Sequence, residues 1–129
     1  MSGGERMNIS SGSPREPVLG YSRAVRVGRF VMVAGTTSGG VGDTAEEQTR
    51  EIIARIATAL ERADATLADV VRTRVYLTDL ERDFDAVGAV HGEVFGGIRP
   101  VTATVGVQAL AGATTLVEIE VDAILADGA

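Results

Sequence analysis

The sequence contains no cysteine, no tryptophan and a single histidine, and aromatic residues make up only 4% of its 129 positions. Without cysteine the chain can form neither disulfides nor thiolate sites, which fits a cytoplasmic protein. One histidine and no cysteine argue against a zinc centre with several protein ligands, so we expect no metal site. The shortage of aromatic rings argues against base-stacking platforms for nucleic acid.

Long apolar runs and clusters of positive charge are missing as well. No apolar stretch approaches the length of a membrane span, and the N-terminus lacks the apolar core of a signal peptide. The formal net charge is −6, and the arginines that supply the positive charge are scattered along the chain. A nucleic-acid-binding surface normally needs a basic stripe, so we expect neither nucleic acid nor a membrane as a partner.

The length and apolar content suffice for a single domain with its own core. Residues 1–16 are rich in glycine, serine and proline, so we expect a flexible N-terminal segment, with Met7 as an alternative start. Residues 17–126 then form the folded domain. Because aromatic residues are scarce, its core must consist of smaller aliphatic side chains, and we expect it to bury further surface by oligomerising.

Hydrophobic periodicity divides this domain into strands and helices. The start of the first helix is marked by the Ser/Thr-x-x-Glu pattern of Thr44 and Glu47. The predicted elements are strands at 21–27 and 30–34, a helix from 43 or 44 to about 65, a strand at 71–78, a helix at 83–95, and strands at 99–107 and 116–121.

This order, β-β-α-β-α-β-β, predicts an α+β fold in which both helices lie on one face of a mixed β-sheet. The domain offers no third helix for the other face, so we expect another copy of the chain to cover it in a closed ring.

Several residues carry functional groups whose role the pattern leaves open. Glu118 shares a strand face with Glu120 and Asp122, which is either a solvated face or the floor of a site where Glu118 activates a water. His91 is either a boundary residue of its helix or a proton-transfer group. Arg99 either recognises a carboxylate or caps the preceding helix.

The glycine-rich segment 35–42 follows a strand and precedes a helix, as a phosphate-binding loop does. It lacks both the Gly-Lys-Ser/Thr ending and the Gly-x-Gly-x-x-Gly spacing, which favours a plain turn over a nucleotide site. Its backbone N–H groups could still hold a small anion.

From about Pro17 to Leu125 the chain resembles the RidA/YjgF family. The resemblance is carried by Tyr21 to Gly35, Thr73-Arg74-Val75-Tyr76-Leu77-Thr78-Asp79-Leu80, Phe84-x-x-Val87, Arg99-Pro100-Val101-Thr102 and Val117-Glu118-Ile119-Glu120. It implies a chorismate-mutase-like fold and a homotrimer with clefts between its subunits. It also implies hydrolysis of amino-acid-derived enamines and imines to keto acids and ammonia, without metal or cofactor.

The resemblance also implies a set of site residues in that cleft. Glu118 matches the glutamate that holds the attacking water, and His91 is a candidate acid/base group of this chain's own. The expected substrate-binding residues are Tyr21, Ala34, Gly35, Thr36, Arg99, Thr102 and Thr104.

One position departs from the pattern of the imine deaminases in a way that affects substrate binding. Those proteins carry an arginine two residues after the proline, where this chain has Thr102. Threonine cannot form the bidentate bond to a carboxylate, so affinity for 2-imino acids should fall by orders of magnitude unless Arg23, Arg74 or Arg99 replaces it. A helix asparagine common in the deaminases corresponds here to Gly88.

The leading hypothesis is therefore a cytoplasmic, cofactor-independent Rid-type trimer that binds a small metabolite. If it is an enzyme, this hypothesis expects it to hydrolyse a C=N bond with altered specificity or weak activity. The alternative is a non-catalytic small-molecule sensor or protein-interaction module on the same scaffold. Ribonuclease activity, sometimes attributed to this family, gains no support from the acidic composition or the scarce aromatic residues.

Overall fold

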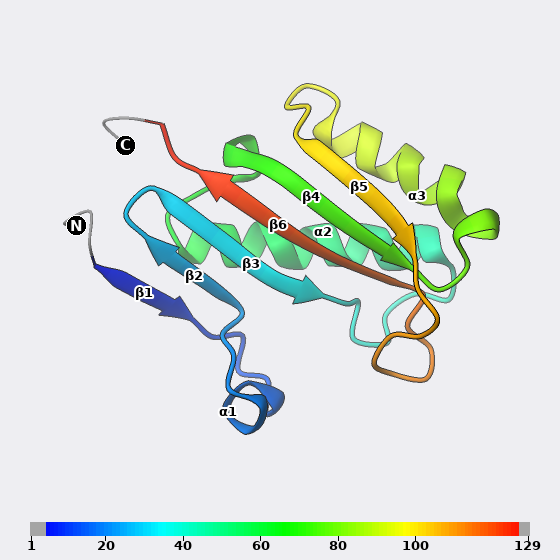
Figure 1. Cartoon of the computed structure of the whole chain (residues 1–129), viewed down its shortest axis with the longest axis horizontal. Helices are drawn as coiled ribbons and strands as arrows, with labels where there is room; N and C mark the ends of the chain where they lie inside the picture. The colour runs from blue at the N-terminus through cyan, green and yellow to red at the C-terminus, as the bar shows by residue number, and fades with distance from the viewer. Residues whose placement is uncertain (1–4, 127–129) are drawn as a thin grey trace.

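The computed structural model describes residues 5–126 and contains one six-stranded mixed sheet. Its elements are β1 (Arg6–Ile9), α1 (Arg15–Leu19), β2 (Ala24–Val27), β3 (Phe30–Thr36), α2 (Ala45–Arg62), η1 (Leu67–Asp69), β4 (Val70–Leu77), α3 (Leu80–Phe95), β5 (Val101–Gly106) and β6 (Val117–Ile124). The strand order is β1-β2-β3-β6-β4-β5, as Figure 1 shows. β4 and β5 run parallel, and the other neighbouring pairs are antiparallel.

The two long helices pack against the same sheet. α2 contacts β3 and β6, α3 contacts β4 and β5, and the helices touch each other (Figure 1). This arrangement confirms the predicted α+β fold with two main helices on a mixed sheet.

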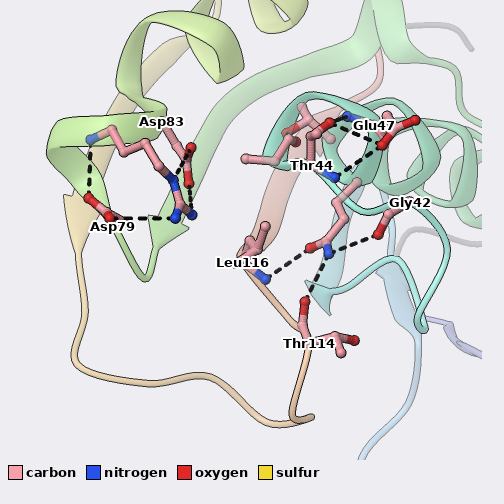
Figure 2. Close-up of polar contacts among 11 residues, drawn as sticks. Gly42, Thr44, Glu47, Asp79, Asp83, Thr114 and Leu116 are labelled. Atoms are coloured by element: carbon pink, nitrogen blue, oxygen red, sulfur yellow. Dashed lines mark hydrogen bonds and ion pairs between the residues drawn. The ribbon is translucent and has the colours of Figure 1, made fainter.

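Both long helices begin at residues whose side chains cap them, as Figure 2 shows. Thr44 Oγ1 accepts a hydrogen bond from the Glu47 backbone N–H at 3.1 Å, and Glu47 Oε1 accepts one from the Thr44 N–H at 3.1 Å. This is the capping box that the sequence predicts, and it satisfies donors that a helix start otherwise leaves open. α3 begins at Leu80, earlier than predicted, because the Asp79 carboxylate accepts a hydrogen bond from the Arg82 N–H at 3.1 Å.

Alternation along the strands separates a buried face of the sheet from an open face. Val117, Ile119 and Val121 of β6 are at most 1% exposed and belong to the core on the helix side. On the open face, Phe30 and Met32 of β3 are 53% and 44% exposed. Large apolar side chains left exposed together are typical of surfaces that contact another protein.

The N-terminal segment differs from the sequence-based expectation. The segment expected to be flexible, residues 1–16, contains regular structure: residues 6–9 form β1 and pair antiparallel with β2, and α1 begins at Arg15. Ile9 is only 6% exposed within the core. A four-residue strand of this kind owes its stability to its neighbour and not to local propensity, so its own sequence gives little signal. Residues 1–4, including the possible start at Met1, lie outside the described residues.

Candidate functional site

An open pocket of about 850 Å³ lies at the end of the sheet where β3 leads into the glycine-rich loop. Its walls come from the N-terminal segment between residues 9 and 23, the end of β3, α2, the loop 111–115 and β6. The glycine-rich segment is therefore a turn that forms part of a pocket wall. The lining extends from the open face of the sheet, where Glu118 lies, to α2.

Glu118 enters this pocket from β6 and is half-buried. Burial raises the pKa of its carboxyl group above the ordinary value, and the neighbouring charge of Glu120 raises it further, while Arg23 opposes the shift. The carboxylate lies directly against Gly35, where any Cβ would overlap Oε2. Only glycine leaves room for the carboxylate in this position.

Arg23 connects the walls of the pocket around Glu118. Its guanidinium lies over the ring of Tyr21, 5.6 Å from the ring centroid. Its Nη1 donates to the Gly35 carbonyl at 3.0 Å and to Thr36 Oγ1 at 2.8 Å, and the Thr36 hydroxyl lies 2.8 Å from the Ala34 carbonyl. These bonds hold the irregular end of β3, where the pairing with β6 shifts register. A cation, a phenol ring and a carboxylate thus line one pocket.

The other carboxylates on the same face of β6 have different surroundings. Glu120 Oε1 accepts a hydrogen bond from the Tyr76 hydroxyl at 2.7 Å, and that bond raises the pKa of Tyr76. Arg74 lies 3.5 Å from Glu120 and 3.4 Å from Asp122. The acidic face is therefore divided: Glu118 belongs to the pocket, and the other two carboxylates belong to a ladder of ion pairs across β4 and β6.

The structure does not bring His91 together with Glu118 in one subunit. His91 Nε2 lies 2.8 Å from Thr73 Oγ1, and the Thr73 hydroxyl donates to Thr102 Oγ1 at 2.7 Å. The ring also packs on Phe95, with centroids 4.7 Å apart. Burial lowers the pKa of His91 below its ordinary value. This chain of polar groups joins α3, β4 and β5 on the side of the sheet that the helices cover.

The remaining predicted residues divide in the same way. Tyr21, Gly35 and Thr36 line the pocket, and Ala34 adjoins it through its carbonyl. The others, Arg99, Thr102 and Thr104, are not among the residues that line the pocket within this chain. Arg99 occupies the turn before β5 with φ of 59°, Thr102 pairs with Thr73, and Thr104 pairs with Val75 of β4.

Sequence reasoning missed three arginines of the pocket, which are Arg15, Arg55 and Arg62. Arg55 forms an ion pair with Glu51 at 2.7 Å, and its guanidinium also lines the pocket. The available signal was spacing, because Arg55 and Arg62 lie two helical turns apart and therefore share one helix face.

The described part of the chain offers neither a cluster of metal ligands nor a membrane-spanning helix. Across residues 5–126, no group of three or more histidine, aspartate or glutamate side chains is placed to hold a metal ion. Over the same residues, none of the helices combines the length and the apolar character that crossing a membrane requires.

Comparisons with known proteins converge on one group. The family model described as Endoribonuclease L-PSP matches residues 13–125. A protein of Streptomyces coelicolor is 40% identical over 121 residues, covering 89% of each chain. A 2-iminobutanoate/2-iminopropanoate deaminase of Dermatophagoides farinae is 29% identical over 108 residues, covering 79% of this chain and 84% of its own. The crystal structure of a YjgF/YER057c/UK114 family member from Mycobacterium tuberculosis has a TM-score of 0.89 at 55% identity, covering 94% of this chain and 100% of that one.

Proposed function

Since the chain belongs to the Endoribonuclease L-PSP family, which includes the RidA/YjgF proteins, we propose that it hydrolyses the C=N bond of a small 2-imino acid. The reaction needs no cofactor, and its product is the corresponding 2-keto acid. The observation that carries the proposal is the half-buried Glu118 carboxylate, which shares a pocket with Arg23, Tyr21 and Gly35.

Glu118 is the proposed general base. A carboxylate whose pKa is raised by burial accepts a proton more readily than an exposed one. As Glu118 takes a proton from water, the water oxygen bonds to the imine carbon. Glu118 then gives that proton to the nitrogen, which yields a carbinolamine. As the C–N bond breaks, the carbinolamine hydroxyl loses its proton and the C=O bond of the keto acid forms. The nitrogen takes up this second proton and leaves as ammonia. Backbone N–H groups near Gly35 stabilise the charge that develops during this addition.

Arg23 is the proposed binding partner for the substrate carboxylate, in place of the arginine whose family position is occupied here by Thr102. Its Nη1 is held by Gly35 and Thr36, and a guanidinium carries five N–H donors, so donors remain for a ligand. The ring of Tyr21 beneath the guanidinium fixes its orientation. An Arg–carboxylate bond of this kind supplies both affinity and direction.

We further propose that the working form is a homotrimer in which copies cover each other's open sheet faces. Phe30 is 53% exposed there, and Val101 on the edge strand β5 is 59% exposed. In such an assembly, Thr102, Thr104 and Arg99 of one copy reach the cleft of the next. His91 then acts as a positioning residue through its contact with Thr73. The cytoplasmic location stays a prediction.

The experiment is an assay of ammonia release from freshly generated 2-iminopropanoate. Wild-type protein should accelerate hydrolysis over buffer, and Glu118→Gln should remove the acceleration. Glu120→Gln is the matched control, because Glu120 lies on the same strand and face but is bonded to Tyr76. If neither wild type nor Thr102→Arg accelerates the reaction, imine hydrolysis is excluded.

Thr102, at the position where the resemblance implies an arginine in the imine deaminases, favours a second candidate, a non-catalytic small-molecule sensor. A sensor would bind 2-keto acids, measured by calorimetry, with no turnover of the imine. Glu118→Gln would then leave every measured rate at the level of buffer.

A further inference from the structure

The pocket gathers positive charge in a chain that is acidic overall. Its lining includes Arg15, Arg23, Arg55 and Arg62 but a single carboxylate, Glu118. The formal net charge of the whole chain is −6. One guanidinium already binds a carboxylate through two hydrogen bonds, so Arg23 alone suffices for a substrate with one acid group. The additional arginines fit a ligand that carries a second anionic group.

Two of these residues, Arg55 and Arg62, form what we call the α2 arginine pair. They lie on one face of α2, with Thr58 between them, and all three line the pocket. The glycine-rich loop closes against this face, because a Cβ at Gly39 would lie 2.7 Å from Arg55 Nη1. The wall that α2 contributes to the pocket is therefore a preformed basic surface on a helix.

Contacts within the chain leave donors on both members of the α2 arginine pair. Arg55 uses Nε to donate to Glu51 Oε2 at 2.7 Å. Arg62 uses Nη1 to donate to the carbonyl of Ser10. Because each guanidinium has five N–H donors, its other nitrogens can bind a ligand. The ion pair with Glu51 is exposed and therefore weak, so it does not prevent Arg55 from binding an anion.

The size of the pocket agrees with a ligand larger than the imine of alanine. Its volume of about 850 Å³ falls within the range of about 300–1,000 Å³ that is typical of pockets for drug-sized ligands. A substrate that reaches from Arg23 to α2 needs a side chain of its own between its two acid groups.

We propose that the substrate is the imine of an acidic amino acid, a 2-imino dicarboxylate; this inference rests on the proposed function. The first carboxylate binds Arg23 beside Glu118, and the side-chain carboxylate binds the α2 arginine pair. Water adds to the imine carbon, the C–N bond breaks, and the products are a 2-keto dicarboxylate and ammonia. No oxidant, reductant or further reactant is needed for this balance.

The test compares kcat/KM for the imines of aspartate and alanine, with wild type and the double variant Arg55→Gln/Arg62→Gln. Wild type should prefer the dicarboxylate. The double variant should lower the ratio of the two kcat/KM values by about 10- to 100-fold, the loss expected for one or two charge-assisted hydrogen bonds. Arg50→Gln is the control, because Arg50 lies on the same helix but pairs with Glu46 and Glu93. An unchanged ratio in the double variant overturns the inference.

A binding measurement separates this inference from the proposed function. Calorimetry compares 2-oxoglutarate with pyruvate as stable probes, using the same variants and thermal melts to verify folding. If no imine is hydrolysed but 2-oxoglutarate binds more tightly than pyruvate, and only the double variant loses that preference, the proposed function fails and the second anion site stands. If wild type binds both acids equally, the inference is overturned even when 2-iminopropanoate is hydrolysed.

Discussion

Replacing Gln48 by leucine tests how the wall of the pocket is held together. Gln48 is 1% exposed on α2 and makes three hydrogen bonds through its amide. Its Nε2 donates to the carbonyls of Gly42 at 3.2 Å and Thr114 at 2.9 Å, and its Oε1 accepts from the Leu116 N–H at 2.9 Å (Figure 2). One side chain thus connects α2, the glycine-rich loop and the segment that leads into β6.

The expected cost follows from these bonds. Leucine has a similar volume, so packing changes little, but three backbone groups lose a partner. At about 1 kcal/mol for each bond, with an additional penalty where a group stays buried, Gln48→Leu should lower the free energy of unfolding by about 2–4 kcal/mol. Because Thr114 lines the pocket, binding of 2-keto acids should weaken as well.

Urea unfolding followed by circular dichroism, at one fixed protein concentration, measures this change. Thr49→Val is the matched control, since Thr49 is equally buried and its hydroxyl donates only to Ala45 within the same helix, at 2.7 Å. That control should cost less than about 1 kcal/mol. Equal stability of the Gln48 and Thr49 variants would refute the role assigned to the amide.

Three further predictions concern the pocket and the titratable groups. Gly35→Ala should displace the Glu118 carboxylate and lower kcat/KM for imine hydrolysis by about tenfold or more, whereas Gly92→Ala on α3, where a Cβ meets no atom within 4 Å, should leave it unchanged. Since the pKa of Glu118 is raised in the fold, kcat/KM should fall as pH drops through that raised value. The charged carboxylate also destabilises the fold, so Glu118→Gln should unfold at a higher urea concentration than wild type at pH 7. This difference in unfolding midpoint should vanish below the ordinary pKa of 4.5, where the carboxyl group is protonated in both states. Since the pKa of His91 is lowered, the folded state binds fewer protons than the unfolded chain below pH 6.5. The free energy of unfolding should therefore decline as pH falls from 6.5 to the pKa of His91 in the folded state. Urea titrations of His91→Gln should lose this decline, and an unaltered decline would contradict the lowered pKa assigned to His91.

Local signals predicted much of the fold, and particular residues show why. Thr44 and Glu47 cap α2 through contacts between near neighbours in the chain, so their pattern was sufficient. Val117 and Ile119 alternate with Glu118 on β6, which correctly separated the two faces of the sheet. β1 was missed because it forms by pairing with β2, more than ten residues further along the chain. Ile9 is buried only once this pairing is in place.

The site was only partly predictable because it is assembled from distant segments. Arg55 and Arg62 were missed although their seven-residue spacing places them on one helix face, because the folding of loop 111–115 against α2 is what makes that face a pocket wall. His91 and Glu118 were both considered as reactive groups. The pleat of the sheet separates them, because Thr73 points toward the helices whereas Glu118 lies on the open face.

The most direct test of the central claim is a crystal structure of the protein soaked with 2-oxobutanoate, a stable analogue of the proposed substrate and product. The carboxylate of the ligand should bind Arg23, and a water held by Glu118 should lie against the carbonyl carbon. A ligand bound away from Glu118, or a Glu118 carboxylate that contacts neither the ligand nor a water beside it, would contradict the account.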